Sequence, residues 1–164
     1  KLQVNIAKIY GSRGESWLAE LPRSIEELEN AWRLSNLKPL SNLSYSYVLE
    51  GFQDRTPIIL KLSPDANLID QEVRALDVFK GFGAVSVLGC KNGALLLERA
   101  MPGTLLKNSH PKENRIEIAC NVMDRLHQAP LSVEGKFPHI GEWLSAIDKE
   151  WDLPKIHLER ARRL

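Results

Sequence analysis

Cysteine is scarce in this sequence, and its scarcity argues against two kinds of protein. The 164 residues include two cysteines, Cys90 and Cys120, and neither has a second cysteine or a histidine at metal-binding spacing. This pattern matches neither a disulfide framework nor a zinc site. Both cysteines lie among apolar residues in the sequence, which predicts buried, reduced thiols.

Long hydrophobic runs and an excess of one charge are also missing. No segment approaches the ~20 apolar residues of a membrane span, and the N-terminus lacks the pattern of an export signal. The 22 lysines and arginines balance 21 acidic residues, so the net charge is +1. Such a balance gives no field that would attract nucleic acid or a membrane surface. We expect a soluble, cytoplasmic protein without nucleic-acid or membrane partners.

Several catalytic motifs are absent as well. The chain contains no Gly-x-Gly-x-x-Gly and no Gly-Lys-Ser/Thr phosphate-binding motif. None of the four histidines is followed by aspartate two residues later, as the catalytic loop of a kinase would require: His110, His127, His139 and His157. These histidines are widely separated, so we expect surface or capping roles and no metal site.

The first part of the chain has the pattern of two short helices. An apolar segment from Trp17 to Leu21 is followed by Pro22, which predicts a helix end. Ser24 then resembles an N-cap with Glu27 as its capping-box partner. The apolar residues of this second helix recur on one face.

The remaining patterns predict an α+β fold. Alternating apolar residues over 37–49 and the run 57–62 predict two antiparallel strands, and Ser63-Pro64-Asp65 begins a helix that ends near Gly81. Two more strands are predicted over 84–88 and 94–97, around an Asn92-Gly93 turn. Everything after residue 103 has helical periodicity. The expected order is helix, two strands, helix, two strands and then helices.

Lys61 and Glu72 are the most informative polar residues. Lys61 lies among strong strand formers, where an exposed lysine is the ordinary alternative. Glu72 lies beside the apolar stripe of the following helix, where it either pairs with a cation or reaches solvent. A strand lysine paired with a helix glutamate is the arrangement that kinases use to hold nucleotide phosphates.

The segment around Ser44 and Ser46 is a second candidate. It contains no glycine, but its backbone amides and serine hydroxyls are able to approach a phosphate. Small polar residues before a strand also form ordinary turns, and that alternative stays open.

Five segments of the chain resemble one known family. The segments are 14–22, Ser44-Tyr45-Ser46-Tyr47-Val48, 59–62, 71–76 and Gly93 to Thr104, whose run LLLERAMPGT is the most specific. In this order they are similar to the streptomycin-kinase branch of the aminoglycoside phosphotransferases, also called hydroxyurea phosphotransferases. The resemblance covers most of the chain.

The resemblance implies a protein-kinase-like fold that binds ATP and Mg²⁺ between two lobes. Residues 1–100 would form the nucleotide-binding amino-terminal lobe, an antiparallel sheet plus helices. Residues 101–164 would form the interlobe linker and the first helices of a truncated helical lobe. Lys61 would contact the phosphates, with Glu72 as its ion-pair partner. The linker backbone at Glu98, Ala100 and Met101 would bind adenine, although Glu98 and Arg99 also fit an exposed strand end.

The implied acceptor is a small polar molecule with a hydroxyl group, such as an aminoglycoside. The catalytic aspartate and the metal ligands lie further along in this family, so we expect no activity from this chain alone. A non-catalytic nucleotide-binding or interaction module and an unrelated α+β domain are the alternatives. Exposed apolar stripes in the helical half, including Trp143, Ile147 and Trp151, predict self-association.

Overall fold

The structure is a computed structural model of the chain. It describes residues 1–41, 43–109, 112–130, 137, 141, 144–145 and 155–161. The chain divides into two compact units, residues 1–133 and 134–164. The predicted lobe boundary after residue 100 is a different division and stays a prediction. Of the second unit, the structure describes helix α6 (Lys155–Ala161) and four further residues.

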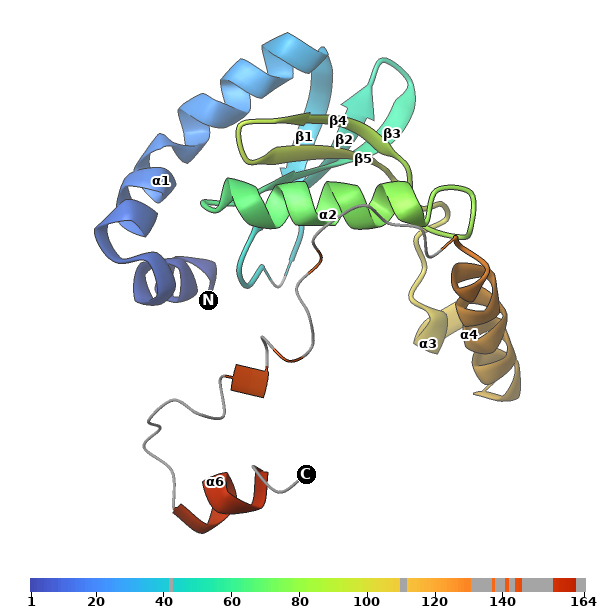
Figure 1. Cartoon of the computed structure of the whole chain (residues 1–164). Helices are drawn as coiled ribbons and strands as arrows, with labels where there is room; N and C mark the ends of the chain where they lie inside the picture. Colours follow the sequence, from blue (N-terminus) through green and yellow to red (C-terminus); the bar gives the residue numbers. More distant parts are fainter. Residues whose placement is uncertain are drawn as a thin grey trace. The chain divides into compact units, whose positions relative to one another are not determined.

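Helix α1 (Leu2–Trp32) consists of two helical segments that meet at a kink at Gly11, so the predicted break at Pro22 was wrong. Pro22 lies inside the second of these segments. Figure 1 shows the bend between the two segments of α1. A proline in a helix removes one hydrogen bond. Apolar residues on both sides of Pro22 pack against the sheet, which keeps the helix continuous: Trp17, Leu21, Ile25 and Leu28. Ser24 is therefore not an N-cap, and Glu27 pairs with Arg23 at 3.0 Å.

Five antiparallel strands form the sheet in the order β1-β2-β3-β5-β4. The strands are β1 (Leu34–Pro39), β2 (Tyr47–Gln53), β3 (Thr56–Leu62), β4 (Val87–Lys91) and β5 (Ala94–Glu98). The mixed helices and sheet confirm the predicted α+β class. Three strands precede the second helix where the sequence predicted two.

Strand β1 was not predicted as a separate strand because a bulge breaks its alternation. The register with β2 shifts between Ser35 and Lys38, and Asn36 has a left-handed φ of 54°. The bulge brings the Leu37 side chain over Gly51 in β2. A Cβ atom at Gly51 would lie 2.9 Å from the Ser35 carbonyl oxygen and 2.6 Å from Leu37 Cδ2, so a larger residue would require the backbone of β1 to shift.

The hairpin between β4 and β5 confirms the predicted Asn-Gly turn. Asn92 and Gly93 both have positive φ, 50° and 75°, as a two-residue hairpin turn favours. The first of these strands begins at Val87, however, and not at residue 84 as predicted. Residues 84–86 precede it as a non-strand segment.

Replacing Gly93 with alanine should destabilise the fold by about 2 kcal/mol. A Cβ atom there would lie 2.9 Å from the Ser63 carbonyl oxygen, in addition to the strain of a positive φ. Gly81→Ala is the matched control, because Gly81 also has a positive φ but nothing lies within 4 Å of its added Cβ. Urea unfolding of both variants measures their free energies of unfolding. The difference between them is the cost of the contact with Ser63, since both variants share the strain of a positive φ. Equal losses of stability would show that the contact with Ser63 has no effect.

The sheet carries one apolar cluster on each face. On one face, α1 packs against side chains that include Leu60, Leu62 and Leu96. On the other face, helix α2 (Ala66–Val78) packs against Leu95 and Leu97. Figure 1 shows α2 running alongside the β4–β5 hairpin. The predicted apolar stripe of α2 makes this contact through Ile69, Val73 and Leu76. Residues of β3 and β5 therefore alternate between two cores.

Helices α3 (Leu106–Ser109) and α4 (Lys112–His127) follow the sheet. Ile116 and Met123 of α4 are exposed apolar residues. The predicted stripe at 143–151 lies outside the described residues, so self-association stays a prediction. Among the residues that the structure describes, no helix is both long and apolar enough to cross a membrane.

Both cysteines are exposed and unpaired, so the prediction of buried thiols was wrong. Cys90 is in β4, an edge strand of the sheet, and Cys120 is on α4. Apolar neighbours in the sequence do not bury a residue when no other helix or strand packs against its side of the strand or helix. Partial desolvation raises the pKa of the Cys90 thiol above its ordinary value, and the charge of Asp70 raises it further.

Candidate functional site

Lys61 lies on the face of the sheet that α2 covers. In β3 the residues Ile58, Leu60 and Leu62 are buried toward α1, so the alternating residues face the other way. Lys61 is paired in the sheet with Val48 and Leu95, and Leu95 belongs to the apolar cluster under α2. The strand period therefore places a lysine beside the apolar cluster under α2.

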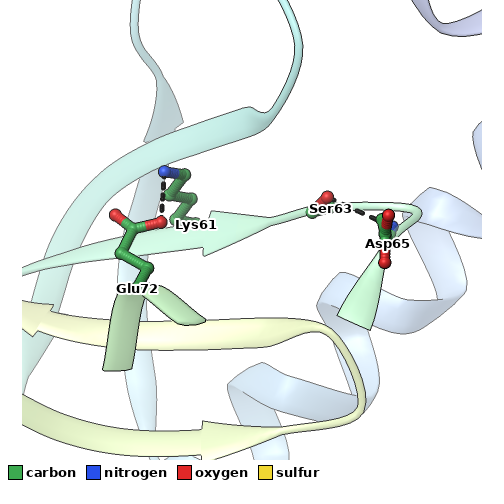
Figure 2. Close-up of polar contacts among 4 residues, drawn as sticks. All are labelled: Lys61, Ser63, Asp65 and Glu72. Atoms are coloured by element: carbon green, nitrogen blue, oxygen red, sulfur yellow. Dashed lines mark hydrogen bonds and ion pairs between the residues drawn. The ribbon is translucent and has the colours of Figure 1, made fainter. Parts of the chain in front are cut away.

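Glu72 reaches Lys61 from helix α2. The Lys61 Nζ atom donates a hydrogen bond to the Glu72 Oε2 atom at 2.6 Å (Figure 2). The two side chains are 27% and 32% exposed, so neither is an ordinary solvated surface group. An ammonium group has three N–H donors, and Glu72 takes one of them. The pair can therefore keep its ion bond while Lys61 contacts an anionic ligand.

A short, well-fixed turn determines where α2 begins and hence where Glu72 lies. The Asp65 carboxylate caps the helix by accepting from the Asn67 amide at 3.0 Å. The buried Ser63 hydroxyl accepts from the Asp65 amide at 3.1 Å (Figure 2). Arg13 of α1 donates to the Pro64 carbonyl oxygen at 2.7 Å. Two local contacts thus fix the turn between β3 and α2, and the contact of Arg13 joins this turn to α1.

The turn also affects Tyr10 of α1. Desolvation raises the pKa of the Tyr10 hydroxyl, the negative charge of Asp65 raises it further, and Arg13 lowers it in part. A raised pKa keeps the phenol neutral. Tyr10 therefore adds no charge near the start of α2.

Ser44 lies in the connection between β1 and β2. The side chain of Asn5 in α1 donates to the Ser44 carbonyl oxygen at 2.9 Å, which ties this connection to the first turns of the chain. Sequence reasoning did not find Asn5, because the contact spans 39 residues. The predicted role of Ser44 at a phosphate stays a prediction.

The segment after β5 contains the other predicted binding residues. Glu98 is the last residue of β5, and its carboxylate accepts from the Ser86 amide at 3.1 Å. Arg99 Nη2 lies 2.7 Å from Glu50 Oε2 of β2. Glu98 is exposed at the end of β5, as the alternative of an exposed strand end predicted, and Arg99 is partly buried. The binding role of the linker stays a prediction. Ala100 and Met101 follow directly, and Met101 is exposed.

A separate cavity lies on the opposite side of the sheet from Lys61. It has a volume of about 250 Å³ and lies between α1 and the tip of the β4–β5 hairpin. Trp17 and Leu28 line it from α1, and Leu62 and Ala94 line it from the strands. These side chains face α1, so the cavity is not part of the site around Lys61.

The next feature is metal binding by the part of the chain that the structure describes. No group of three His, Cys, Asp or Glu side chains there is placed to hold a metal ion. The expected nucleotide contacts, from the Lys61 cation to phosphate oxygens and from the linker backbone to a base, stay predictions. Lys61 and Glu72 come together as the sequence predicted, and Ser44 and the linker lie on other elements of the same lobe.

The fold and the site define a class of protein. A five-stranded antiparallel sheet, a helix on one face, and a strand lysine paired with a glutamate of that helix form the amino-terminal lobe of a protein-kinase-like fold. Residues 32–147, more than half of the chain, match the family described as aminoglycoside/hydroxyurea antibiotic resistance kinase. The chain belongs to that family.

One curated relative is the streptomycin 6-kinase of Streptomyces glaucescens. It is 26% identical to this chain over 132 residues. The match covers 79% of this chain but 43% of the relative. The chain therefore spans less than half the length of this curated relative.

Proposed function

We propose that this chain is the ATP-binding portion of a small-molecule kinase. The observation that carries the proposal is the 2.6 Å ion pair between Lys61 and Glu72, which joins the middle of the sheet to α2. Lys61 would contact the phosphates, Glu72 would orient it, and the backbone around Glu98, Ala100 and Met101 would bind the base. Ser44, in the β1–β2 connection, would lie near the phosphates. Mg²⁺, when bound with ATP, would neutralise phosphate charge.

The proposed reaction is transfer of the γ-phosphoryl group of ATP to a hydroxyl of a small polar acceptor. The family and the streptomycin 6-kinase relative support an aminoglycoside-like acceptor, as in antibiotic resistance. We place this activity in the cytoplasm, where ATP is available. These 164 residues contain no His-x-Asp catalytic loop, so we infer that they bind nucleotide without catalysing transfer.

The absence of that loop also favours a second candidate function. In it, the chain is a non-catalytic nucleotide-binding or interaction module with a kinase-like lobe. The two candidates share nucleotide binding and differ in chemistry. Neither candidate predicts transfer of radiolabelled phosphate from ATP to streptomycin by these 164 residues alone. The discriminating observation is the gene beyond Leu164, where a His-Gly-Asp loop followed by Asn and Asp would establish the kinase and a stop codon would favour the module.

Titration with MgATP tests the shared proposal. A ligand that binds only the folded state raises its stability, by about 1.4 kcal/mol at ten times the Kd. We expect a rise in the thermal unfolding midpoint that saturates with ATP, and calorimetric binding with one site. An unchanged midpoint together with no heat of binding at millimolar ATP would contradict nucleotide binding.

A further inference from the structure

The backbone pairing between β3 and β5 ends asymmetrically at the linker. The Arg99 amide donates to the Pro57 carbonyl oxygen at 3.3 Å. Proline has no N–H group, so Pro57 cannot return a bond to the Arg99 carbonyl oxygen. Arg99, the first linker residue, is therefore joined to β3 by one backbone hydrogen bond where an antiparallel pair normally exchanges two.

A side-chain contact is present at the same point. Arg99 Nη2 and Glu50 Oε2 are 2.7 Å apart, and both side chains are about one-third exposed, at 31% and 32%. Glu50 belongs to β2, which is separated from β5 by β3. The ion pair thus crosses β3 and attaches the linker to the next strand.

The other side of the linker is fixed independently. The Glu98 amide donates to the Ser86 carbonyl oxygen at 2.9 Å, and the Glu98 carboxylate accepts from the Ser86 amide. Glu98 is therefore held toward the β4 side, while Arg99 is held toward β2. Two adjacent residues fix the linker from opposite directions.

The ion pair starts from the face of the sheet that carries Lys61. Glu50 is directly opposite Ile59, and Ile59 is two residues before Lys61 in β3. Two residues along a strand span roughly 7 Å. A nucleotide whose phosphates contact Lys61 would extend along this face toward the linker.

We propose that Arg99 is a positioning residue, whose ion pair with Glu50 holds the linker amides at the base end of the nucleotide site. This inference rests on the proposed function. Arg99 acts in this scheme through its ion pair with Glu50, and the scheme requires no contact between its guanidinium group and the ligand. Its effect on binding passes through the backbone of residues 98–101.

The test compares ATP with adenosine, which has the base but no phosphates. Binding of both is measured by displacement of a fluorescent ATP analogue from the full chain. Arg99→Met removes the charge and retains much of the apolar stem. Arg23→Met is the matched control, because Arg23 forms an exposed ion pair with Glu27 on α1. Lys61→Met reports on the phosphate end.

Arg99→Met is expected to raise the Kd of ATP and of adenosine by the same factor, about fivefold. Lys61→Met should raise the Kd of ATP and leave that of adenosine unchanged. The double exchange Glu50→Arg with Arg99→Glu should recover part of the loss, and Arg23→Met should have no effect. Arg99→Lys, which keeps the charge, serves as the second variant if Arg99→Met fails to fold, and should weaken both ligands equally by a smaller factor.

Two results would overturn the inference while the proposed function stands. One is ATP binding that Lys61→Met weakens but the Arg99 variants leave unchanged. The other is an Arg99 effect on ATP without an equal effect on adenosine. Failure of the unmodified chain to bind ATP would instead overturn the proposed function.

Discussion

Lys61→Met is expected to raise the Kd for ATP about thirtyfold, which corresponds to about 2 kcal/mol. Methionine keeps the length of the side chain but removes the ammonium that would contact the phosphates. The variant also leaves Glu72 without its partner, 32% exposed and negatively charged on the side where phosphates would lie. Isothermal titration calorimetry with MgATP measures the change.

Lys91→Met is the matched control for this experiment. Lys91 is also a lysine of the sheet, but it lies at the end of β4 and lines the cavity on the α1 side. Its removal should leave ATP affinity within about twofold, since no contact with the Lys61 site is expected. Equal affinities of the Lys61→Met chain and the unmodified chain would contradict the role given to Lys61.

Leu60→Ala is expected to lower the free energy of unfolding by about 3 kcal/mol. Leu60 is next to Lys61 in β3 but faces the opposite way, and its side chain is 0% exposed within the cluster under α1. The smaller side chain leaves a cavity that the strands around it cannot fill. Urea unfolding followed by circular dichroism measures the loss.

Leu68→Ala provides the comparison on the surface. Leu68 is in α2 and is 49% exposed, so removing its side chain should cost less than about 1 kcal/mol. A loss as large as that of Leu60→Ala would show that the two-sided burial of β3 is not what stabilises the lobe. Leu60 and Lys61 are adjacent in β3, but the first substitution tests the stability of the fold and the second tests nucleotide binding.

Local signals in the sequence predicted several elements correctly. Asp65 begins α2, the spacing of Ile69, Val73 and Leu76 gives its buried face, and Asn92-Gly93 forms the hairpin turn. Each of these features depends on residues within a few positions of one another. Hydrogen bonds and side-chain periodicity at that range are present in the sequence itself.

The wrong predictions share a cause, which is packing between distant segments. Pro22 does not end α1 because apolar residues before and after it meet the same sheet. The bulge at Asn36 interrupts the alternation of apolar and polar residues in β1, so the sequence pattern does not indicate a strand there. Cys90 is exposed because β4 is an edge strand.

The candidate site also has features that local sequence predicts and features that depend on packing between distant segments. The sequence by itself determined that a lysine interrupts an apolar strand and that a glutamate lies on the edge of the next helix, because both follow from period and spacing. Only the tertiary structure decided that Lys61 Nζ and Glu72 Oε2 are 2.6 Å apart. The pairing of Arg99 with Glu50 was likewise decided by the tertiary structure. Glu50 and Arg99 are separated by 49 positions in the sequence and meet only because β2, β3 and β5 are neighbours in the sheet. No local pattern encodes such a contact, since strand order and register are set by the packing of the whole lobe.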